Sequence, residues 1–220
     1  MRTRGREDYL KTIYTLQRTS SPVRTTDIAR ALGVEPASVT GVIKRLAELD
    51  LLEYAPYKGV TLTDKGLKVA LEVIRSHRLI ELYLVEALGY TWDEVHEEAE
   101  RLEHAVSPRF IARIEAALGY PETDPHGAPI PTEDGTIRPR SENPLSSLKV
   151  SESGTITRVT DEDPGLLRYL DSLGIRPGEQ VTVLSVAPYG GPIQLLVGEA
   201  EHNIGREAAM QIFVRASTGD

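Results

Sequence analysis

The chain has 220 residues, of which 40% are hydrophobic and 26% charged, a composition typical of a globular protein with one or two domains. It contains no cysteine, which excludes disulfides, thiolate nucleophiles and cysteine-ligated metal clusters. No apolar run approaches the ~18 residues of a membrane span, and no apolar stretch follows the basic N-terminus, so we expect a cytoplasmic protein without a secretory signal.

Charge is distributed unevenly along the chain, whose net charge is -8. Residues 1–75 carry 13 Lys and Arg against 9 Asp and Glu, whereas residues 76–150 carry 7 against 14 and residues 151–220 carry 5 against 10. A basic first third joined to an acidic remainder is typical of a nucleic-acid-binding module attached to other domains. Such an excess is common by itself, so the order of elements has to support this interpretation.

Three helices are expected early in the chain, because apolar residues recur at helical spacing over 7–18, 24–34 and 37–49. Gly33 suits the turn after the second helix, and Pro36 stands at the favoured first position of the third. A helix, a short turn with glycine and a helix that begins with small side chains form the helix-turn-helix pattern. Small side chains let such a helix approach the base edges in the major groove.

Residues 51–63 read as two short strands around a turn at Pro56–Gly59, which predicts a wing directly after the recognition helix. Tyr57 and Lys58 at its tip can reach phosphate or the minor groove. The alternative is a three-helix core with an incidental hairpin, whose polar residues are only surface. The candidate DNA-contacting residues are Arg24, Thr26, Pro36, Ala37, Ser38, Thr40, Lys44, Tyr57 and Lys58.

A long helix is expected to begin after Thr63–Asp64 and to continue to Gly89. It has more apolar positions than one small winged helix can bury, which favours a homodimer interface, since duplex readers commonly pair to match two half-sites. His77 and Glu81 lie one turn apart on this helix, so both can face one cation. A lone histidine in such a place is more often an interface residue.

The run His-Glu-Glu-Ala-Glu-Arg-Leu-Glu-His at residues 96–104 is the most informative feature of the chain. On a helix, four of its side chains share an arc of about 100°. These are His96, Glu100, Glu103 and His104. Two imidazoles and two carboxylates on one arc suit manganese, ferrous iron or zinc. The alternative is a solvated acidic face, which is common on exposed helices rich in Glu.

A further helix is expected over 107–118, and a proline-rich linker follows over 120–144, which holds six of the 14 prolines. Within it, Asp124 and His126 can ligate a metal or form a turn, and without support from other residues the turn is favoured. The pattern therefore leaves the role of this pair open.

Residues 148–220 alternate strands and turns, which predicts a small β-barrel. The expected elements are strands over 155–159, 180–186, 192–197 and 211–214 and a helix over 164–173. This part of the sequence has no nucleophile elbow, no Gly-rich phosphate loop and no paired serine and lysine. It therefore gives no indication of catalysis.

The order of these elements, the His77–Glu81 segment, the 96–104 run and Asp-Pro-His-Gly-Ala-Pro-Ile-Pro at 124–131 resemble the diphtheria toxin repressor family of metal-dependent transcriptional regulators, in particular its three-domain manganese transport regulators. The resemblance covers nearly the whole chain and implies a mainly α fold with a small β domain. The implied parts are a winged helix-turn-helix DNA-binding domain at 1–63, a helical metal-binding and dimerisation domain at 64–119, a Pro-rich linker at 120–147 and an SH3-like β-barrel at 148–220.

The resemblance also implies two metal positions. The first is formed by Asp8, Glu100, Glu103 and His104. The second is formed by His77, Glu81 and His96, or, as in three-domain manganese regulators, by Glu81, Asp124, His126 and an acid of the C-terminal domain, for which Asp161 is the candidate. Four of the five histidines thus fall on ligand positions, which is hard to ascribe to chance.

The carboxylates favour manganese among the possible metals. Asp8 and Glu100 stand where iron-sensing relatives carry sulfur ligands, and harder oxygen donors shift the preference toward Mn²⁺. Fe²⁺ and Zn²⁺ stay as alternatives, since zinc outcompetes manganese at most such sites. Asp124 replaces a cysteine of relatives. Lys11 replaces a bridging glutamate of two-domain manganese regulators, so their closely spaced metal pair is not expected. Gly41 replaces a longer side chain near the bases, which leaves the operator sequence open.

The resemblance implies a manganese-dependent repressor of metal-uptake genes that binds double-stranded operator DNA as a homodimer, with no membrane partner, no small-molecule substrate and no enzymatic activity. Metal joins the DNA-binding and dimerisation domains by neutralising carboxylates that otherwise repel each other. Three alternatives stay open: an iron- or zinc-responsive regulator of the same architecture, a metal-independent regulator with a structural acidic cluster, and a metal-dependent hydrolase. The hydrolase needs an open metal position in a pocket, which this sequence does not indicate.

Overall fold

The computed structural model describes residues 4–161 and 163–217, and the chain divides into two compact units. The first comprises Met1–Ser76 with Pro131–Thr136, and the second comprises His77–Ile130 with Ile137–Asp220. One long helix, α4 (Asp64–Leu88), contributes residues to both units. None of the described helices combines the length and the apolar character that crossing a bilayer needs.

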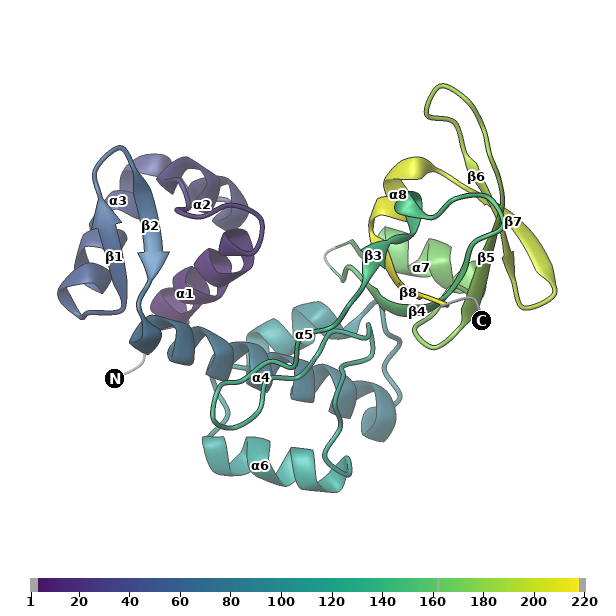
Figure 1. Cartoon of the computed structure of the whole chain (residues 1–220). Coiled ribbons are helices and arrows are strands. Elements are labelled where there is room, and N and C mark those ends of the chain that lie inside the picture. The colour runs from purple at the N-terminus through teal and green to yellow at the C-terminus, as the bar shows by residue number, and fades with distance from the viewer. Residues whose placement is uncertain (1–3, 162, 218–220) are drawn as a thin grey trace. The chain divides into compact units, whose positions relative to one another are not determined.

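Three helices and a hairpin form most of the first unit (Figure 1). They are α1 (Arg4–Gln17), α2 (Thr25–Leu32), α3 (Pro36–Glu48), β1 (Leu52–Ala55) and β2 (Gly59–Leu62). Their apolar faces meet in one core, whose most buried side chains are Leu10, Ile13, Ile28, Val39, Ile43, Leu46, Leu52 and Val60. The predicted helices and the wing are therefore confirmed, with bounds that differ by a few residues.

The turn between α2 and α3 has the geometry that its residues favour. Gly33 follows α2 with a φ of 63°, a left-handed conformation that glycine adopts without a steric penalty. Pro36 opens α3 at the first position, where its missing N–H interrupts no helical hydrogen bond. The hydroxyl of Ser38 donates a hydrogen bond to the carbonyl oxygen of Glu35 at 2.7 Å. The start of the predicted recognition helix is thus fixed by local chemistry.

The wing is held to the segment that precedes α2. Its strands pair antiparallel, with Leu52 opposite Leu62. Val60 also exchanges two backbone hydrogen bonds with Val23, at 2.8 and 2.9 Å. Gly59 has a φ of 124°, and a Cβ there would lie 2.6 Å from the carbonyl oxygen of Val23, so only glycine fits this approach.

Helix α4 begins at a side-chain cap and ends at a glycine. The hydroxyl oxygen of Thr63 accepts a hydrogen bond from the backbone N–H of Gly66 at 3.1 Å. Gly89 follows the last turn with a φ of 74°. The predicted start and end of this helix are therefore confirmed.

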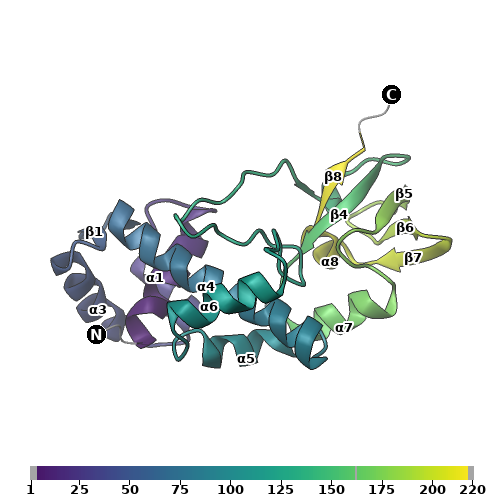
Figure 2. The ribbon, with the colours of Figure 1, turned by 90° about the horizontal axis from the view of Figure 1, so that it is seen from below.

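Two shorter helices, α5 (Val95–Leu102) and α6 (Pro108–Ala117), accompany the C-terminal half of α4 (Figures 1 and 2). Their common core consists of Leu79, Ile80, Leu84, Val95, Ala99, Ile111, Ile114 and Ile130. The side chain of Ser107 caps α6 by accepting a hydrogen bond from the N–H of Phe110 at 3.2 Å. This core fixes α5 beside the residues of α4 that carry the metal-ligand motif.

A six-stranded antiparallel sheet forms the C-terminal part of the second unit. Its strands are β3 (Asn143–Pro144), β4 (Ser153–Val159), β5 (Gln180–Val186), β6 (Ile193–Val197), β7 (Ala200–Ile204) and β8 (Ile212–Ala216), in the order β3-β8-β4-β5-β6-β7. Three short helices belong to it, η1 (Leu145–Ser147), α7 (Pro164–Ser172) and α8 (Arg206–Met210). Trp92, from the loop before α5, is buried in the core of this sheet.

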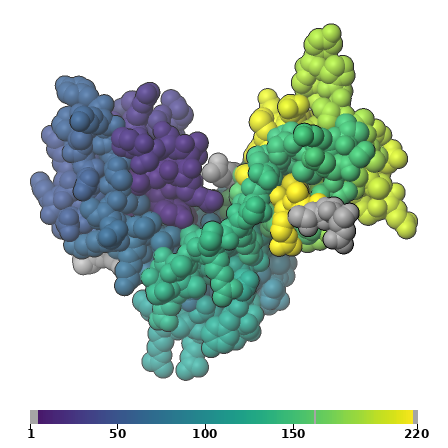
Figure 3. Space-filling view, in the orientation of Figure 1, coloured from purple at the N-terminus to yellow at the C-terminus, as the bar shows by residue number. Residues whose placement is uncertain are grey.

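The four predicted strands and α7 are present, whereas β3, β7 and α8 were not predicted. β7 is an edge strand whose only buried residue is Ile204, so it lacks the alternation that identifies a strand. The β5–β6 hairpin stands out as a light-green knob in Figure 3. Tyr189 belongs to the turn between these strands and is fully exposed. β3, which pairs with β8, lies inside the segment that was assigned to the linker.

The proline-rich segment after α6 is docked on the sheet rather than extended in solvent. Its buried residues include Asp124, His126, Ala128 and Ile130. The N–H of Val159 at the end of β4 donates to the carbonyl oxygen of His126 at 2.9 Å. Gly127 has a φ of 85°, and a Cβ there would lie 2.1 Å from the carbonyl oxygen of Thr157. These contacts fix His126 against β4.

Candidate metal centre and nucleic-acid interface

Glu81 is the centre of a buried group of ligand atoms. Helix α4 places His77 and Glu81 one turn apart, and α5 presents His96 to them. One oxygen of Glu81, Oε1, lies 2.9 Å from Nε2 of His77 and 3.3 Å from Nδ1 of His96. Glu81 is 0% exposed, so this carboxylate has no water to solvate it.

Asp124 and His126 approach the same carboxylate from the proline-rich segment. Oδ1 of Asp124 accepts hydrogen bonds from the N–H groups of His126 and Ala128, at 2.8 and 2.9 Å, and so forms the turn that the sequence favoured. Nε2 of His126 donates to the carbonyl oxygen of Trp92 at 2.7 Å, which leaves Nδ1 as the lone-pair nitrogen of the neutral ring. That Nδ1 lies 3.8 Å from Oε2 of Glu81. The pair therefore has both the turn geometry and the ligand geometry.

Asp161, the candidate for the acid of the C-terminal domain, lies beside these residues. It follows β4, and its Oδ2 lies 3.7 Å from Nδ1 of His96 and 4.0 Å from Nδ1 of His126. The structure thus brings together both ligand sets that the sequence left as alternatives. Their ligand atoms lie within 4.8 Å of one another in the set His77, Glu81, His96 and Asp161 and in the set Glu81, Asp124 and His126.

These residues fit a divalent cation. Three of the buried side-chain atoms that have no hydrogen-bond partner in the described chain belong to this group, namely Oε2 of Glu81, Oδ2 of Asp124 and Nδ1 of His126. Buried polar atoms are nearly always satisfied, so such a group calls for a ligand. Metal–ligand bonds of about 2.1 Å place neighbouring ligand atoms about 3.0 to 3.4 Å apart. Several of the separations around Oε1 of Glu81 lie in or close to this range.

The protonation states show how the metal-free centre balances its charge. Burial opposes ionisation of Glu81, but the charge of His77 and the facing imidazoles of His126 and His96 hold its pKa well below the usual value. Burial and the repulsion from Glu81 raise the pKa of Asp124 to about 7. Burial disfavours the charged form of His126, but the facing carboxylates of Glu81, Asp124 and Asp161 raise its pKa to about 9. A proton on His126 therefore supplies positive charge where a cation fits.

The other predicted ligand set is arranged differently from the expectation. Helix α5 ends at Leu102, and Glu103 caps it with helical backbone angles and an N–H that donates to the carbonyl oxygen of Ala99 at 2.8 Å, whereas His104 lies in the following turn. Oε2 of Glu103 lies 2.5 Å from Nδ1 of His77, and its Oε1 lies 3.2 Å from Nε2 of His104. His96 turns instead to Glu81, as described above.

Glu100 and Asp8 complete the description of that set. Glu100 projects from α5 with a side chain that is 54% exposed, and its Oε1 lies 3.8 Å from Nε2 of His96. Asp8 is half-buried on α1 in the first unit. The ligand roles of Asp8, Glu100, Glu103 and His104 stay predictions.

The candidate DNA-contacting residues lie on the surface of the winged helix. Eight are exposed: Arg24, Thr26, Pro36, Ala37, Ser38, Lys44, Tyr57 and Lys58. Thr40 is half-buried on α3. Tyr57, at the tip of the wing, has a φ of 64° and is fully exposed. These residues belong to the helix-turn-helix and its wing, and they offer both charged and small side chains to a duplex.

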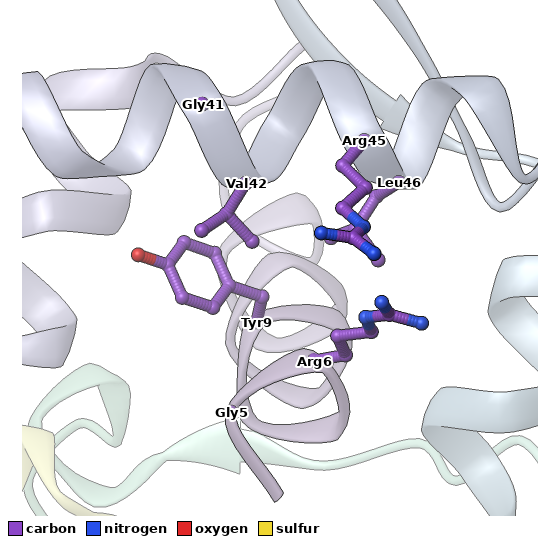
Figure 4. Close-up of a pocket in the computed structure, with 7 residues that line it drawn as sticks. All are labelled: Gly5, Arg6, Tyr9, Gly41, Val42, Arg45 and Leu46. Atoms are coloured by element: carbon purple, nitrogen blue, oxygen red, sulfur yellow. The ribbon is translucent and has the colours of Figure 1, made fainter. Parts of the chain in front are cut away.

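Two arginines that the sequence analysis did not select converge beside α3. An open hollow of about 530 Å³ is lined by Gly5, Arg6, Tyr9, Gly41, Val42, Arg45 and Leu46. In Figure 4 the guanidinium groups of Arg6 and Arg45 point into the space between α1 and α3. Only the tertiary fold reveals this pair, because the two residues lie far apart in the sequence.

Comparison with known proteins identifies three consecutive family models along the chain. The N-terminal DNA-binding domain of the iron-dependent repressors matches residues 1–60, their metal-binding and dimerisation domain matches 63–132, and the FeoA domain matches 143–216. The iron-dependent repressor IdeR of Mycobacterium tuberculosis is 31% identical over 220 residues, which cover 94% of this chain and 95% of that protein. The chain belongs to the iron-dependent repressor family of metal-dependent transcriptional regulators.

Other members of this family are similar as well. The transcriptional regulator MntR of Bacillus subtilis is 36% identical over 124 residues, which cover 56% of this chain and 87% of that protein. A solved structure of a manganese-dependent transcriptional repressor in complex with manganese has a TM-score of 0.90 and 41% identity, and covers 96% of this chain and 100% of that one. The structure of ScaR with bound Cd²⁺ has a TM-score of 0.82 and 36% identity, with coverages of 96% and 98%.

Membership in the iron-dependent repressor family confirms several predictions. The chain is a metal-dependent, DNA-binding transcriptional regulator with a winged helix, a helical dimerisation domain and a small SH3-like β domain. This family consists of regulators rather than enzymes, so the hydrolase alternative is not supported.

Proposed function

We propose that this regulator represses metal-uptake genes by binding double-stranded operator DNA as a homodimer when Mn²⁺ is plentiful. The observation that carries the proposal is the meeting of Glu81, Asp124, His126 and Asp161 from remote segments of the chain around buried atoms without hydrogen-bond partners. A regulator that binds metal at such a place couples the metal to the arrangement of its domains.

The charges of the centre give a bound cation a role in holding its parts together. Three carboxylates, Glu81, Asp124 and Asp161, approach each other where solvent is excluded, so they repel unless a positive charge joins them. When bound, the cation supplies that charge together with directional bonds to oxygen and nitrogen. The centre then holds the helices, the proline-rich segment and the sheet in one arrangement. The cation favours this arrangement only by the difference between its binding free energy there and its binding free energy in other arrangements.

We further propose that Asp8, Glu100, Glu103 and His104 form the second metal position, which ties the DNA-binding domain to the dimerisation domain. This proposal rests on the family resemblance of these positions, while the 3.2 Å contact between Oε1 of Glu103 and Nε2 of His104 is compatible with it. The boundaries 1–63, 64–119, 120–147 and 148–220 remain our proposal for the domains. As a regulator of transcription the protein acts where the genes are, in the cytoplasm.

Manganese is the proposed metal because all candidate ligands are carboxylate oxygens and imidazole nitrogens. A similar solved structure, that of a manganese-dependent repressor in complex with manganese, supports this choice. The alternative is a ferrous-iron regulator, which the similarity to IdeR, an iron-dependent repressor, favours. Zn²⁺ satisfies the same donors and is the third possibility.

The DNA-binding residues are proposed on the winged helix. The backbone-contacting candidates are Arg24, Lys44, Tyr57 and Lys58, and the candidates near base edges are Thr26, Pro36, Ala37, Ser38 and Thr40. The convergence of Arg6 and Arg45 beside α3 adds two further phosphate-binding candidates.

A titration of labelled DNA from upstream of metal-transporter genes tests the proposal. We expect specific binding with Mn²⁺ and its loss after chelation, and a smaller maximal stimulation by saturating Fe²⁺ or Zn²⁺. Equal binding by metal-free and Mn²⁺-loaded protein would contradict the proposed function, and stronger stimulation by Fe²⁺ would favour the iron alternative.

A further inference from the structure

The proline-rich segment passes twice between the two compact units of the chain. Residues Pro131–Thr136 group with the first unit, which contains the winged helix, whereas the residues before and after them group with the second. Helix α4 is divided in the same way, between Ser76 and His77. We call residues 129–136 the strap. The strap and α4 are therefore two separate stretches of chain that each continue from one unit into the other.

Two arginines of α4 hold the strap. Arg78 donates a hydrogen bond from Nη1 to the carbonyl oxygen of Pro129, and its Nε lies 3.4 Å from Oδ2 of Asp124. Arg75, three residues earlier on the same helix face, donates from Nη1 to the carbonyl oxygen of Pro131 at 2.7 Å. Prolines offer no N–H for a regular ladder, so the carbonyl oxygens of this stretch depend on side-chain donors. The Arg75 bond lies within the first unit and the Arg78 bond within the second.

Packing of the strap continues along α4 in the opposite chain direction. Gly135 has a φ of 81°, and a Cβ there would lie 4.0 Å from side-chain carbons of Lys68 and Leu71. The N–H of Thr136 donates to Oγ1 of Thr132 at 3.0 Å, which closes a turn at this end of the strap. Higher residue numbers in the strap thus meet lower residue numbers in α4. The strap lies antiparallel along the part of α4 that belongs to the first unit.

The path from the Glu81 centre to the strap is short and has few free torsions. Asp124, a candidate ligand, accepts a hydrogen bond at Oδ1 from the N–H of Ala128 at 2.9 Å. Ile130 is buried in the core formed by α4, α5 and α6. The rings of Pro129 and Pro131 fix their φ angles. A movement of Asp124 is therefore passed on to Pro131 rather than absorbed by the intervening backbone.

We infer that Arg75 is a positioning residue, which fixes the strap to α4 and thereby couples the Glu81 centre to the DNA-binding unit. Arg75 is neither a candidate metal ligand nor a predicted DNA contact, so its effect is on the coupling between the two. The inference rests on the proposed function and deepens it, because it names the connection through which Mn²⁺ changes operator binding. Since coupling is reciprocal, operator DNA should raise the affinity for Mn²⁺ by the same factor, and both factors should depend on Arg75.

The variant Arg75→Gln tests the inference by removing the guanidinium donor. Arg138→Gln is the matched control, because it removes the same charge from an exposed arginine of the proline-rich segment, whose partner is the exposed Glu122. Fluorescence anisotropy measures operator affinity with and without Mn²⁺, and equilibrium dialysis measures Mn²⁺ affinity with and without operator DNA.

We expect Mn²⁺ to tighten operator binding of the wild type and the control by about 5- to 150-fold, and that of Arg75→Gln by at most about 2-fold. Without the other ligand, Arg75→Gln should bind Mn²⁺ and the operator as the wild type does. Arg75→Lys, which retains a charged donor, should recover most of the stimulation. Undiminished stimulation of Arg75→Gln, even with a lower free energy of unfolding, would overturn the inference.

The salt dependence of operator binding distinguishes positioning from a direct DNA contact. If Arg75 contacted a phosphate, Arg75→Gln would reduce the slope of log affinity against log salt concentration by about 1 in the Mn²⁺-loaded protein. We expect the slope to stay that of the wild type. A reduced slope would overturn the inference.

Hydrogen exchange of the wild-type protein gives a test that needs no variant. The N–H groups of Gly135 and Thr136 donate within the turn to the carbonyl oxygen and Oγ1 of Thr132, at 2.9 and 3.0 Å. Mn²⁺ should slow the exchange of these two N–H groups by about 3-fold or more, because it tightens the strap on α4. If circular dichroism shows that Arg75→Gln is not folded, this measurement decides the matter, and exchange that Mn²⁺ does not change would overturn the inference.

The same titrations separate this inference from the proposed function. If Mn²⁺ stimulates operator binding of the wild type and of Arg75→Gln equally, the coupling through Arg75 fails and the proposed function stands. If Mn²⁺ does not stimulate the wild type, the proposed function fails together with the inference.

Discussion

His77 and Glu103 are joined by a contact of 2.5 Å between Nδ1 and Oε2. The opposite nitrogen of the same ring, Nε2, lies 2.9 Å from Oε1 of Glu81. One imidazole therefore connects the buried centre around Glu81 to Glu103, which belongs to the other proposed metal position. A proton or a cation at Nε2 of His77 therefore changes the properties of Nδ1, which faces Glu103, and the reverse also holds.

His77→Gln tests this connection. We expect Mn²⁺ affinity to fall by roughly 10- to 100-fold at the Glu81 centre, the range for lost or misoriented ligand partners, and to fall also at the position of Glu103 and His104. Isothermal titration calorimetry of the variant measures both, with His202→Gln as the control. An effect on the Glu81 centre alone would show that the 2.5 Å contact carries no coupling.

The single tryptophan of the chain reports on the same centre. Trp92 is stacked on His126 with ring centroids 5.8 Å apart and an interplanar angle of 23°. We expect Mn²⁺, which is paramagnetic, to quench its fluorescence as the centre fills. The quenching should persist in His104→Gln and disappear in His126→Gln. Equal quenching in both variants would mean that Trp92 does not sense occupation at His126.

Metal binding should release protons and strengthen as the pH rises. The pKa of His126 is raised to about 9, so the ring is protonated at pH 7.5 and must lose this proton before Nδ1 can bind a metal. The pKa of Asp124, raised to about 7, adds a proton below neutrality. The affinity for Mn²⁺ should therefore increase with pH up to about pH 9 and then level off.

Calorimetry in buffers with different ionisation enthalpies counts these protons. At pH 7.5 we expect net proton release on Mn²⁺ binding, which His126→Gln reduces. An affinity that is independent of pH between 6 and 9, with no proton released, would contradict the protonated state of His126 in the metal-free protein.

Two glycines inside helices should respond in opposite ways to alanine. A Cβ at Gly66 would lie 1.8 Å from the carbonyl oxygen of Leu51, so Gly66→Ala should lower the free energy of unfolding by about 2 kcal/mol or more. A Cβ at Gly41 meets no atom within 4 Å, so Gly41→Ala should raise it by about 0.5 to 1 kcal/mol. Urea unfolding measures both, and equal effects would contradict the close approach of Gly66 to the carbonyl oxygen of Leu51.

The arginine pair beside α3 gives a prediction for DNA binding. If Arg6 and Arg45 contact phosphates, each alanine variant should weaken operator binding and reduce the slope of log affinity against log salt concentration by about 1. Arg206→Ala, at an exposed site of the β domain, should leave the slope unchanged. A slope that does not differ from the wild type would exclude the pair from the interface.

Local patterns predicted the winged helix well. Helical spacing, Gly33 and Pro36 are short-range signals, and the structure places helices and turn where they indicate. The pairing of His77 with Glu81 was predictable for the same reason, since one helical turn separates them. These elements depend on neighbours in the sequence, which a single chain displays directly.

The rest of the centre depends on tertiary contacts. The burial of Asp124 and His126 in a proline-rich segment follows from docking on β4 and Trp92, which no local pattern reveals. The contacts of the 96–104 run, with His96 facing Glu81 and Glu103 facing His77, follow from the packing of α5 against α4. The family resemblance indicated these residues as ligands and put Glu81 in both alternative sets, but only the fold shows that both sets lie around this one carboxylate.

The most direct test of the account is the operator affinity of the wild type and of Glu81→Gln, measured by fluorescence anisotropy with and without Mn²⁺ at fixed ionic strength. Mn²⁺ should tighten binding by the wild type by about 5- to 150-fold, the usual range of coupling between two sites. It should have little effect on Glu81→Gln, which retains its side-chain volume but not its charge. Equal stimulation of both proteins would contradict the claim that the Glu81 centre controls DNA binding.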